Sequence, residues 1–142
     1  MRRPEGVDNV TDHTQRLVRF VRAEVRPLSD QSCEATVELA RHGAGAITAT
    51  APGPIDEQDQ LRAVARATSD ALSEAFAAEG VKVRVVSIQL LRSLTQKTIL
   101  VTLAASRGAD HRTLLGVCDA TSDPVRAAAL AVLNATNRFL AP

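Results

Sequence analysis

Apolar and polar residues alternate along three segments in the first half of the chain, which is typical of strands with one buried face. The clearest segment is CEATVELA, whose apolar residues are Cys33, Ala35, Val37 and Leu39. The glycines of RHGAG then lead into AITATA, so these two segments predict a β-hairpin. The earlier segment LVRFVRAEVR, which is broken near Pro27, predicts a strand, although the arginine spacing over residues 16–26 also fits a helix.

The segment APGPID, residues 51–56, is expected to end the third strand. After it, the apolar residues follow a helical period in place of the alternation. Apolar residues recur three and four positions apart from Leu61 to Phe76. Gly80 suits the end of this helix. The helix begins with three carboxylates that its dipole favours, namely Asp56, Glu57 and Asp59.

The second half of the chain repeats this order. VKVRVVSIQLL, KTILVTLAA and RTLLGVC predict three strands, with a hairpin turn in SRGAD. After the connector DATSDP, an apolar stripe predicts a helix from about Val125 to Leu140. ATVELA aligns with LVTLA at a spacing of 64 residues, and the two helical segments align at the same spacing.

The repeated order predicts an α+β fold that consists of two internally duplicated β-β-β-α units. The units span about residues 15–79 and 81–141, and their two helices are expected to pack against each other and against antiparallel sheets. Residues 15–142 would then form a single domain. Residues 1–14 are polar and lack a period, which predicts a flexible N-terminal arm.

One such unit cannot bury its apolar surfaces alone, and the sheet edges that remain free are often used in association. We therefore expect a homodimer. The sequence contains no apolar run long enough to span a membrane and no secretory signal at its start. A cytoplasmic protein without a membrane partner is expected.

The composition disfavours nucleic acid as a partner. The formal net charge is only +1, and the absence of Trp and Tyr removes the usual stacking platforms for single strands. A weaker alternative is a small nucleic-acid-associated protein that uses a basic stripe on the first segment, which contains Arg16, Arg19, Arg22 and Arg26. On a regular strand this spacing would place the arginines on both faces, so a solvated surface is the favoured interpretation.

No sequence motif for a phosphate loop, a dinucleotide fold, a zinc site or a nucleophile elbow occurs. No catalytic residue, cofactor or metal ligand is therefore predicted, and the protein is not expected to be an enzyme. His42 and His111 are predicted at nearly equivalent places in the two hairpin turns, as solvated side chains. Cys33 and Cys118 lie in apolar or alternating runs, which favours buried free thiols over a disulfide.

The two strand-to-helix connectors remain as candidate binding sites. Each delivers free backbone N–H groups at a helix start, where a carboxylate or another anion can bind. The alternative is that side chains of the chain itself cap these ends: Asp56 in the first unit, and Ser122 or Asp123 in the second, where Pro124 suits the first turn. Capping is the favoured interpretation.

The duplicated order and two segments, ATVELARHGAGAITATAPGPID and LLGVCDATSDPVRAAALAVLNA, resemble the C-terminal regulatory domain of 2-isopropylmalate and citramalate synthases. In that family these connectors meet at the dimer interface and contain an effector amino acid, leucine or isoleucine. The resemblance implies a ligand site formed by Gly53, Pro54, Ile55, Asp56, Asp119, Ala120 and Thr121.

The chain departs from the family where Ala51 and Pro52 replace a glycine and an asparagine, because Pro52 lacks a backbone donor. The catalytic barrel of those enzymes, about 250 residues, does not fit in this chain. We therefore expect a free-standing, non-catalytic regulatory module that binds a branched-chain amino acid or another small carboxylate and acts on a client protein. The alternative is a structural or protein-interaction module without a small ligand.

Overall fold

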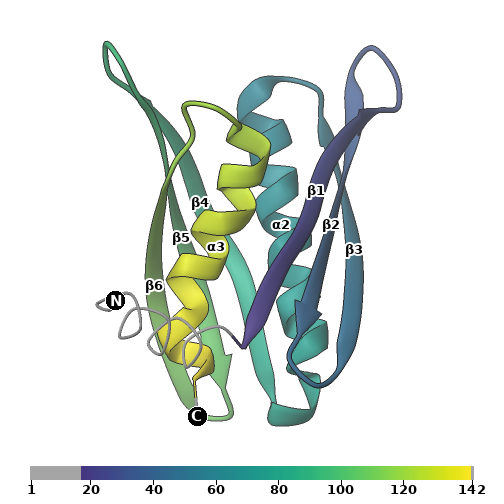
Figure 1. The fold of residues 1–142 in the computed structure, drawn as a ribbon, viewed down its shortest axis with the longest axis vertical. Helices are drawn as coiled ribbons and strands as arrows, with labels where there is room; N and C mark the ends of the chain where they lie inside the picture. Colours follow the sequence, from purple (N-terminus) through teal and green to yellow (C-terminus); the bar gives the residue numbers. More distant parts are fainter. Residues whose placement is uncertain (1–16, 142) are drawn as a thin grey trace, which may run out of the picture.

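A computed structural model describes residues 17–141, and the predicted N-terminal arm lies outside them. The fold consists of two three-stranded antiparallel sheets with two helices between them (Figure 1). The first sheet contains β1 (Val18–Pro27), β2 (Ser32–Arg41) and β3 (Gly45–Pro54). The second contains β4 (Val81–Arg92), β5 (Lys97–Arg107) and β6 (Asp110–Asp119). The helices are α2 (Glu57–Ala75), the short 3-10 helix η1 (Ala77–Glu79) and α3 (Pro124–Leu140).

This architecture confirms the predicted α+β fold and its duplicated β-β-β-α order. Each helix is buried by both sheets. Helix α2 packs on β2 and β3 of its own unit and on β4 of the other, while α3 packs on β5 and β6 and on β1. The helices also contact each other, and their many buried alanines have no long side chains to hold them apart.

The two helices run in the same direction, so their like ends are adjacent (Figure 1). The C-terminal ends of both helices, which have partial negative charge, therefore lie close together. One arginine from each sheet donates a hydrogen bond to a carbonyl group at the nearer of these ends. Arg41, the last residue of β2, donates to Ala75 O at 2.6 Å, and Arg107, the last residue of β5, donates to Phe139 O at 2.9 Å. Each guanidinium also lies over a ring, with Cζ 4.0 Å from the centroid of Phe76 and 5.1 Å from that of Phe139.

These matched contacts define which positions of the two units are equivalent. Arg41 and Arg107 lie more than 64 residues apart, whereas Phe76 and Phe139 lie fewer than 64 apart. The constant spacing of 64 was therefore wrong in detail, although the duplication is confirmed. The first hairpin loop is one residue longer than the second, and α2 has 19 residues where α3 has 17.

Residues 18–27 form a strand, which settles the choice between strand and helix for this segment. A β-bulge between Phe20 and Arg22 adds a residue, so Arg19, Arg22 and Arg26 all lie on the exposed outer face. The expectation that a strand would scatter these arginines over both faces was wrong, because it assumed a regular strand.

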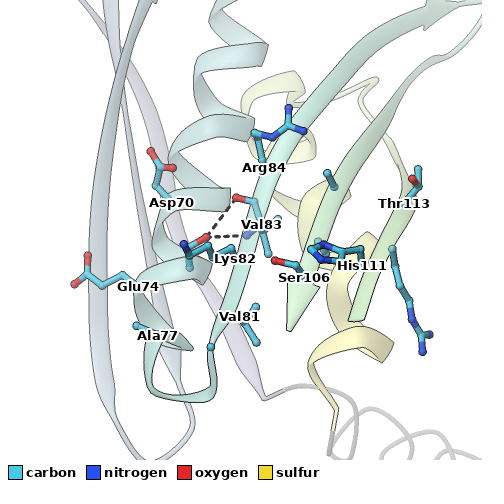
Figure 2. Close-up of a pocket in the computed structure, with 15 residues that line it drawn as sticks. Asp70, Glu74, Ala77, Val81, Lys82, Val83, Arg84, Ser106, His111 and Thr113 are labelled. Atoms are coloured by element: carbon cyan, nitrogen blue, oxygen red, sulfur yellow. Dashed lines mark hydrogen bonds between the residues drawn. The ribbon is translucent and has the colours of Figure 1, made fainter. Parts of the chain in front are cut away.

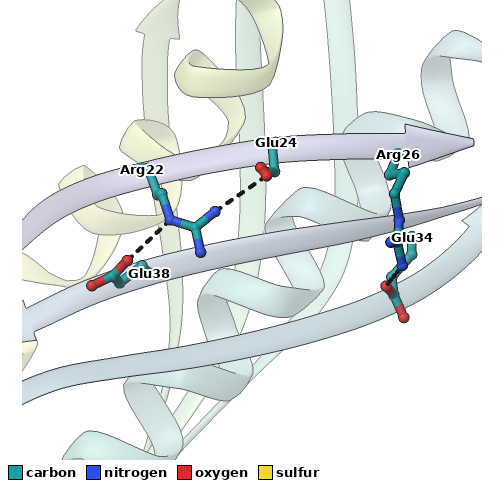
Figure 3. A network of polar contacts seen from close by, with 5 residues as sticks. All are labelled: Arg22, Glu24, Arg26, Glu34 and Glu38. Atoms are coloured by element: carbon teal, nitrogen blue, oxygen red, sulfur yellow. Dashed lines mark hydrogen bonds and ion pairs between the residues drawn. The ribbon is translucent and has the colours of Figure 1, made fainter.

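Acidic residues neutralise two of these arginines on the outer face of the first sheet (Figure 3). Arg22 contacts Glu38 on β2 at 3.0 Å and Glu24 on its own strand at 3.2 Å. Arg26 contacts Glu34 at 2.9 Å. The solvated surface favoured from the sequence is therefore an ion-paired one.

Helix α3 approaches strand β6 closely at Gly116. A Cβ atom there would lie 2.1 Å from Ala131 O and 2.7 Å from Ala135 Cβ of α3, so no side chain fits unless the helix moves. The equivalent residue on β3, counted in register from the hairpin, is Ala51, which is buried against α2. Helix α3 thus packs closer to its own sheet than α2 does.

Gly116→Ala should lower the free energy of unfolding by about 3 kcal/mol, because the added methyl group overlaps the backbone of α3. Gly53→Ala serves as the control, since its Cβ would meet Ala63 Cβ at 3.3 Å and Asp59 O at 3.4 Å. That variant should stay within about 1 kcal/mol of the wild type. Chemical denaturation measures both values, and equal losses in the two variants would contradict the packing described here.

Candidate functional site

The strand-to-helix connectors are shorter than the sequence suggested. Strand β3 continues through Pro54, so the expectation that APGPID ends the strand at its start was wrong. Within this segment Ala51 and Gly53 face the helix layer, while Pro52 and Pro54 are exposed on the opposite face. Prolines are tolerated here because β3 is an edge strand whose outward N–H groups have no ladder partner.

The same backbone hydrogen bond fixes both connectors. Ile55 N–H donates to Gln31 O at 3.0 Å in the first unit, and Ala120 N–H donates to Lys97 O at 2.8 Å in the second. Each bond ties the residue after the third strand to the start of the second: to the turn residue before β2 in the first unit, and to the first residue of β5 in the second. Ile55 is half-buried and Ala120 is fully buried, so both connectors are held rigidly at the same end of the molecule.

Aspartates of the chain cap both helices, as the favoured interpretation of the sequence predicted. Asp56 Oδ1 accepts from Asp59 N–H at 2.9 Å, and Asp123 Oδ1 accepts from Arg126 N–H at 3.1 Å. Asp56 also lies close enough to raise the pKa of Asp59 above its usual value. The helix starts therefore already have negative partners, which lowers their affinity for a further anion.

Asp119 organises the second connector. Its Oδ1 accepts from Thr121 Oγ1 at 2.7 Å and from Thr121 N–H at 3.0 Å. These bonds to the ionised form hold the pKa of Asp119 below its usual value. Thr121 Oγ1 in turn accepts from Lys97 N–H at 3.2 Å, so the carboxylate, the hydroxyl and the strand form one chain of hydrogen bonds.

The seven residues implied by the family resemblance form two groups at this end of the molecule. One group comprises Gly53, Pro54, Ile55 and Asp56, and the other comprises Asp119, Ala120 and Thr121. Within residues 17–141 no hydrogen bond or ion pair links the two groups. A cavity of about 180 Å³ lies at the second connector and is lined by Asp119, Ser122, Asp123, Arg126, Ala127 and Leu130.

The connector end is acidic. In the described part of the chain, no ion pair neutralises Asp56, Asp119 or Asp123, whereas Glu57 contacts Arg92 at 2.5 Å. These carboxylates can attract an ammonium group, and Arg126, which lines the cavity at the second connector, can attract a carboxylate.

The two histidines do not occupy equivalent places. His42 lies in the first hairpin turn, but His111 is the second residue of β6 and is exposed on the outer face of the second sheet. Cys33 is fully buried and Cys118 half-buried; both are free, and burial raises the pKa of each thiol. No cluster of three or more potential metal-ligating side chains occurs between residues 17 and 141.

The sequence did not identify the outer face of the second sheet as a functional surface. A cavity of about 910 Å³ extends over its hairpin end, where Lys82, Arg84, Ser106 and His111 line it (Figure 2). At the connector end the same face exposes large apolar side chains, with Leu115 65% and Val117 54% accessible. The alternation of β4 and β6 was visible in the sequence, but the register that places these residues side by side was not.

Neither protein-family models nor curated protein sequences match this chain. None of its helices within residues 17–141 is long and apolar enough to cross a membrane. The resemblance to synthase regulatory domains therefore rests on the quoted segments and the duplicated order of elements.

Proposed function

We propose that this chain is a non-catalytic regulatory module that acts as a homodimer and binds a branched-chain amino acid at its connector end. The single observation that carries the proposal is a difference between the outer faces of the two sheets, which duplication would have made alike. On the first sheet Glu34 and Glu38 form ion pairs with arginines, whereas Leu100 and Ala104 stand at their positions on the second sheet. Beside them, Leu115 and Val117 are exposed where the first sheet has Thr50 and Pro52.

Counting the paired residues from each hairpin identifies the equivalent positions of the two sheets. Glu34 on β2 is replaced by Leu100 on β5, and Thr50 on β3 by Leu115 on β6. Pro52 is likewise replaced by Val117. Together with Leu91 on β4, the second-unit residues Leu100, Leu115 and Val117 form what we call the apolar zone. An exposed apolar zone on a sheet marks an interaction surface.

The free edge beside the apolar zone can accept another strand. Val117 O accepts from Asn134 Nδ2 at 3.0 Å and therefore points away from β5. In an antiparallel pair, every second residue directs its N–H and C=O groups away from the neighbouring strand. Thr113 and Leu115 are two and four residues from Val117, so their backbone groups also point away from β5. On the equivalent edge of β3, Pro52 and Pro54 remove the donors that strand addition needs.

The other edges are blocked in different ways. Helix α2 covers β4, where Ser73 Oγ accepts from Val83 N–H at 2.9 Å and so occupies a backbone donor of that edge. On β6 the contact with Asn134 occupies one backbone acceptor, Val117 O. A bulge interrupts β1. Strand β6 is thus the edge most open to pairing, and its own copy is the occupant that forms a closed two-fold dimer with matching strands and apolar zones.

The wild-type protein should sediment as a dimer at micromolar concentration, and Leu115→Lys should shift it to a monomer. The charge would lie between the two apolar zones, where it would be desolvated without a partner. Thr50→Lys places the same side chain at the equivalent position of the first sheet and should leave the dimer intact. Sedimentation velocity distinguishes the states.

A monomeric wild type would contradict the proposed dimer. Dissociation by Thr50→Lys but not by Leu115→Lys would place the interface on the first sheet instead.

The connector end supports an amino-acid ligand because it combines carboxylates with partly apolar surroundings. Asp119 and Asp123 offer negative charge to an ammonium group, and Leu130 and Ala127 line the adjacent cavity. Thr121 and Ser122 supply hydroxyl groups within the same connector. A second copy would add to a site that one chain builds only in part, as the family resemblance implies.

Leucine, isoleucine or valine should raise the melting temperature, with a stabilisation of about 2.7 kcal/mol at about 100 times the dissociation constant. 4-Methylpentanoate, which is leucine without its amino group, should have no effect, because it lacks the cation that the carboxylates attract. Asp119→Asn keeps the Oδ1 acceptor for Thr121 but removes the charge, and should weaken the shift. Asp70→Asn, an exposed change on α2, is the control.

No shift with any of the three amino acids would refute this ligand. An equal shift with 4-methylpentanoate would refute the role of the ammonium group.

A further inference from the structure

The hairpin end of the second sheet carries a cluster of cationic and hydroxyl side chains on its outer face. Register pairing places Lys82, Ser106 and His111 directly across three neighbouring strands. The next outward row along the same face consists of Arg84, Ala104 and Thr113. We call these six residues the cationic grid.

The grid has the shape of a trough. Its middle strand contributes only the small side chains of Ser106 and Ala104, which are half-buried, while the flanking residues of β4 and β6 are exposed. Neighbouring strands lie about 4.8 Å apart, so long side chains on β4 and a histidine on β6 can converge over this floor. A cavity of about 910 Å³ covers the whole grid and continues past the edge of β4 to Asp70, Ser73 and Glu74 of α2, so part of its volume lies beyond the grid.

The first unit shows what this surface looks like when it is neutralised. Arg22 occupies the position equivalent to Arg84, and its cross-strand neighbour Glu38 forms an ion pair with it at 3.0 Å. In the second unit Ala104 stands in place of that glutamate. Arg84 and Lys82 have no ion pair within residues 17–141.

Two further differences between the units add hydrogen-bond donors. Ser106 replaces Ala40 in the middle of its row, and His111 replaces Ala46 at its end. All three differences make the second sheet more favourable for an anion: one acidic side chain is absent, and two side chains that can donate hydrogen bonds are present near Arg84.

The carboxylates that border the cavity do not belong to the grid. Asp70 and Glu74 are on α2, and they lie on the far side of β4 from Ser106, His111 and Thr113 (Figure 2). Asp110 contacts Arg112 at 3.3 Å, beyond the end of the grid. No acidic side chain occupies any of the six grid positions.

We infer that the cationic grid is a binding site for a small phosphorylated molecule that carries at least two negative charges. Arg84 offers the fork of donors that matches two phosphate oxygens, and Lys82 adds a point charge beside it. The hydroxyl groups of Ser106 and Thr113 and the imidazole of His111 can donate to the remaining oxygens. This site is separate from the connectors and does not depend on the proposed amino-acid ligand.

Inorganic pyrophosphate is the probe, because it presents the shared phosphate chemistry without a particular organic group. In an NMR titration it should shift the amide signals of Ser106, His111 and Thr113, and leave those of Ala40, Ala46 and Thr48 unchanged. Citrate, matched in ionic strength, tests whether a polycarboxylate binds equally well. A short DNA duplex tests whether the site instead reads the backbone of a nucleic acid.

Two variants make the test specific. Ala104→Glu restores the acid of the first unit and should abolish binding, while Arg84→Gln should weaken it by about tenfold or more. Arg22→Gln changes the equivalent arginine of the first sheet and should leave the affinity unaltered. Each substitution is on an exposed or half-buried outer face, so the dispersion of the amide spectrum should show that the fold persists.

Amide shifts confined to the second sheet and abolished by Ala104→Glu would support the site. Absence of any shift, equal losses in Arg84→Gln and Arg22→Gln, or unchanged affinity in Ala104→Glu would each overturn it. Tighter binding of citrate, or of the duplex, would overturn the assignment to a small phosphorylated molecule.

Discussion

The fold depends on a layer of two helices that neither sheet can cover alone. Each helix is enclosed by strands of its own unit on one side and by the first strand of the other unit on the opposite side. Small side chains permit this close packing. At Gly116, for example, α3 lies so close to β6 that no side chain fits. Because both helices run in the same direction, two aspartates cap one end of the layer and two strand arginines cap the other.

Once the inner faces are used for the core, the outer faces are free to diverge. The first sheet is closed by the pairs Arg22–Glu38 and Arg26–Glu34 and by prolines along its free edge. In the second sheet the equivalent acids are absent: within residues 17–141 Arg84 at the hairpin end has no ion pair, and apolar side chains are exposed at the connector end. The two units thus provide an internal comparison, in which paired positions have ion pairs on one sheet and uncharged or apolar residues on the other.

Much of the fold followed from periodicity, because alternation and the helical period are local properties of the chain. The hairpins and the Gly80 helix end, with a φ of 73°, are equally local. The errors arose where register decides the outcome. The bulge after Phe20 brought the arginines onto one face, and the two-residue turn of the second hairpin left His111 on strand β6 and not in the turn. The connectors were found from sequence, but the outer face of the second sheet was not, since its residues come together only through pairing across three strands.

The proposed homodimer requires β6 to be an open edge that pairs with a second copy, whereas the prolines of β3 close its edge. Amide hydrogen exchange, measured residue by residue over a range of protein concentrations, tests it directly. Dimerisation through β6 requires the exchange of Thr113 and Leu115 to slow as the concentration rises, while Thr48 and Thr50 on β3 exchange at a constant rate. Exchange along β6 that is independent of concentration, or protection that rises equally on both strands, would contradict this description of the molecule.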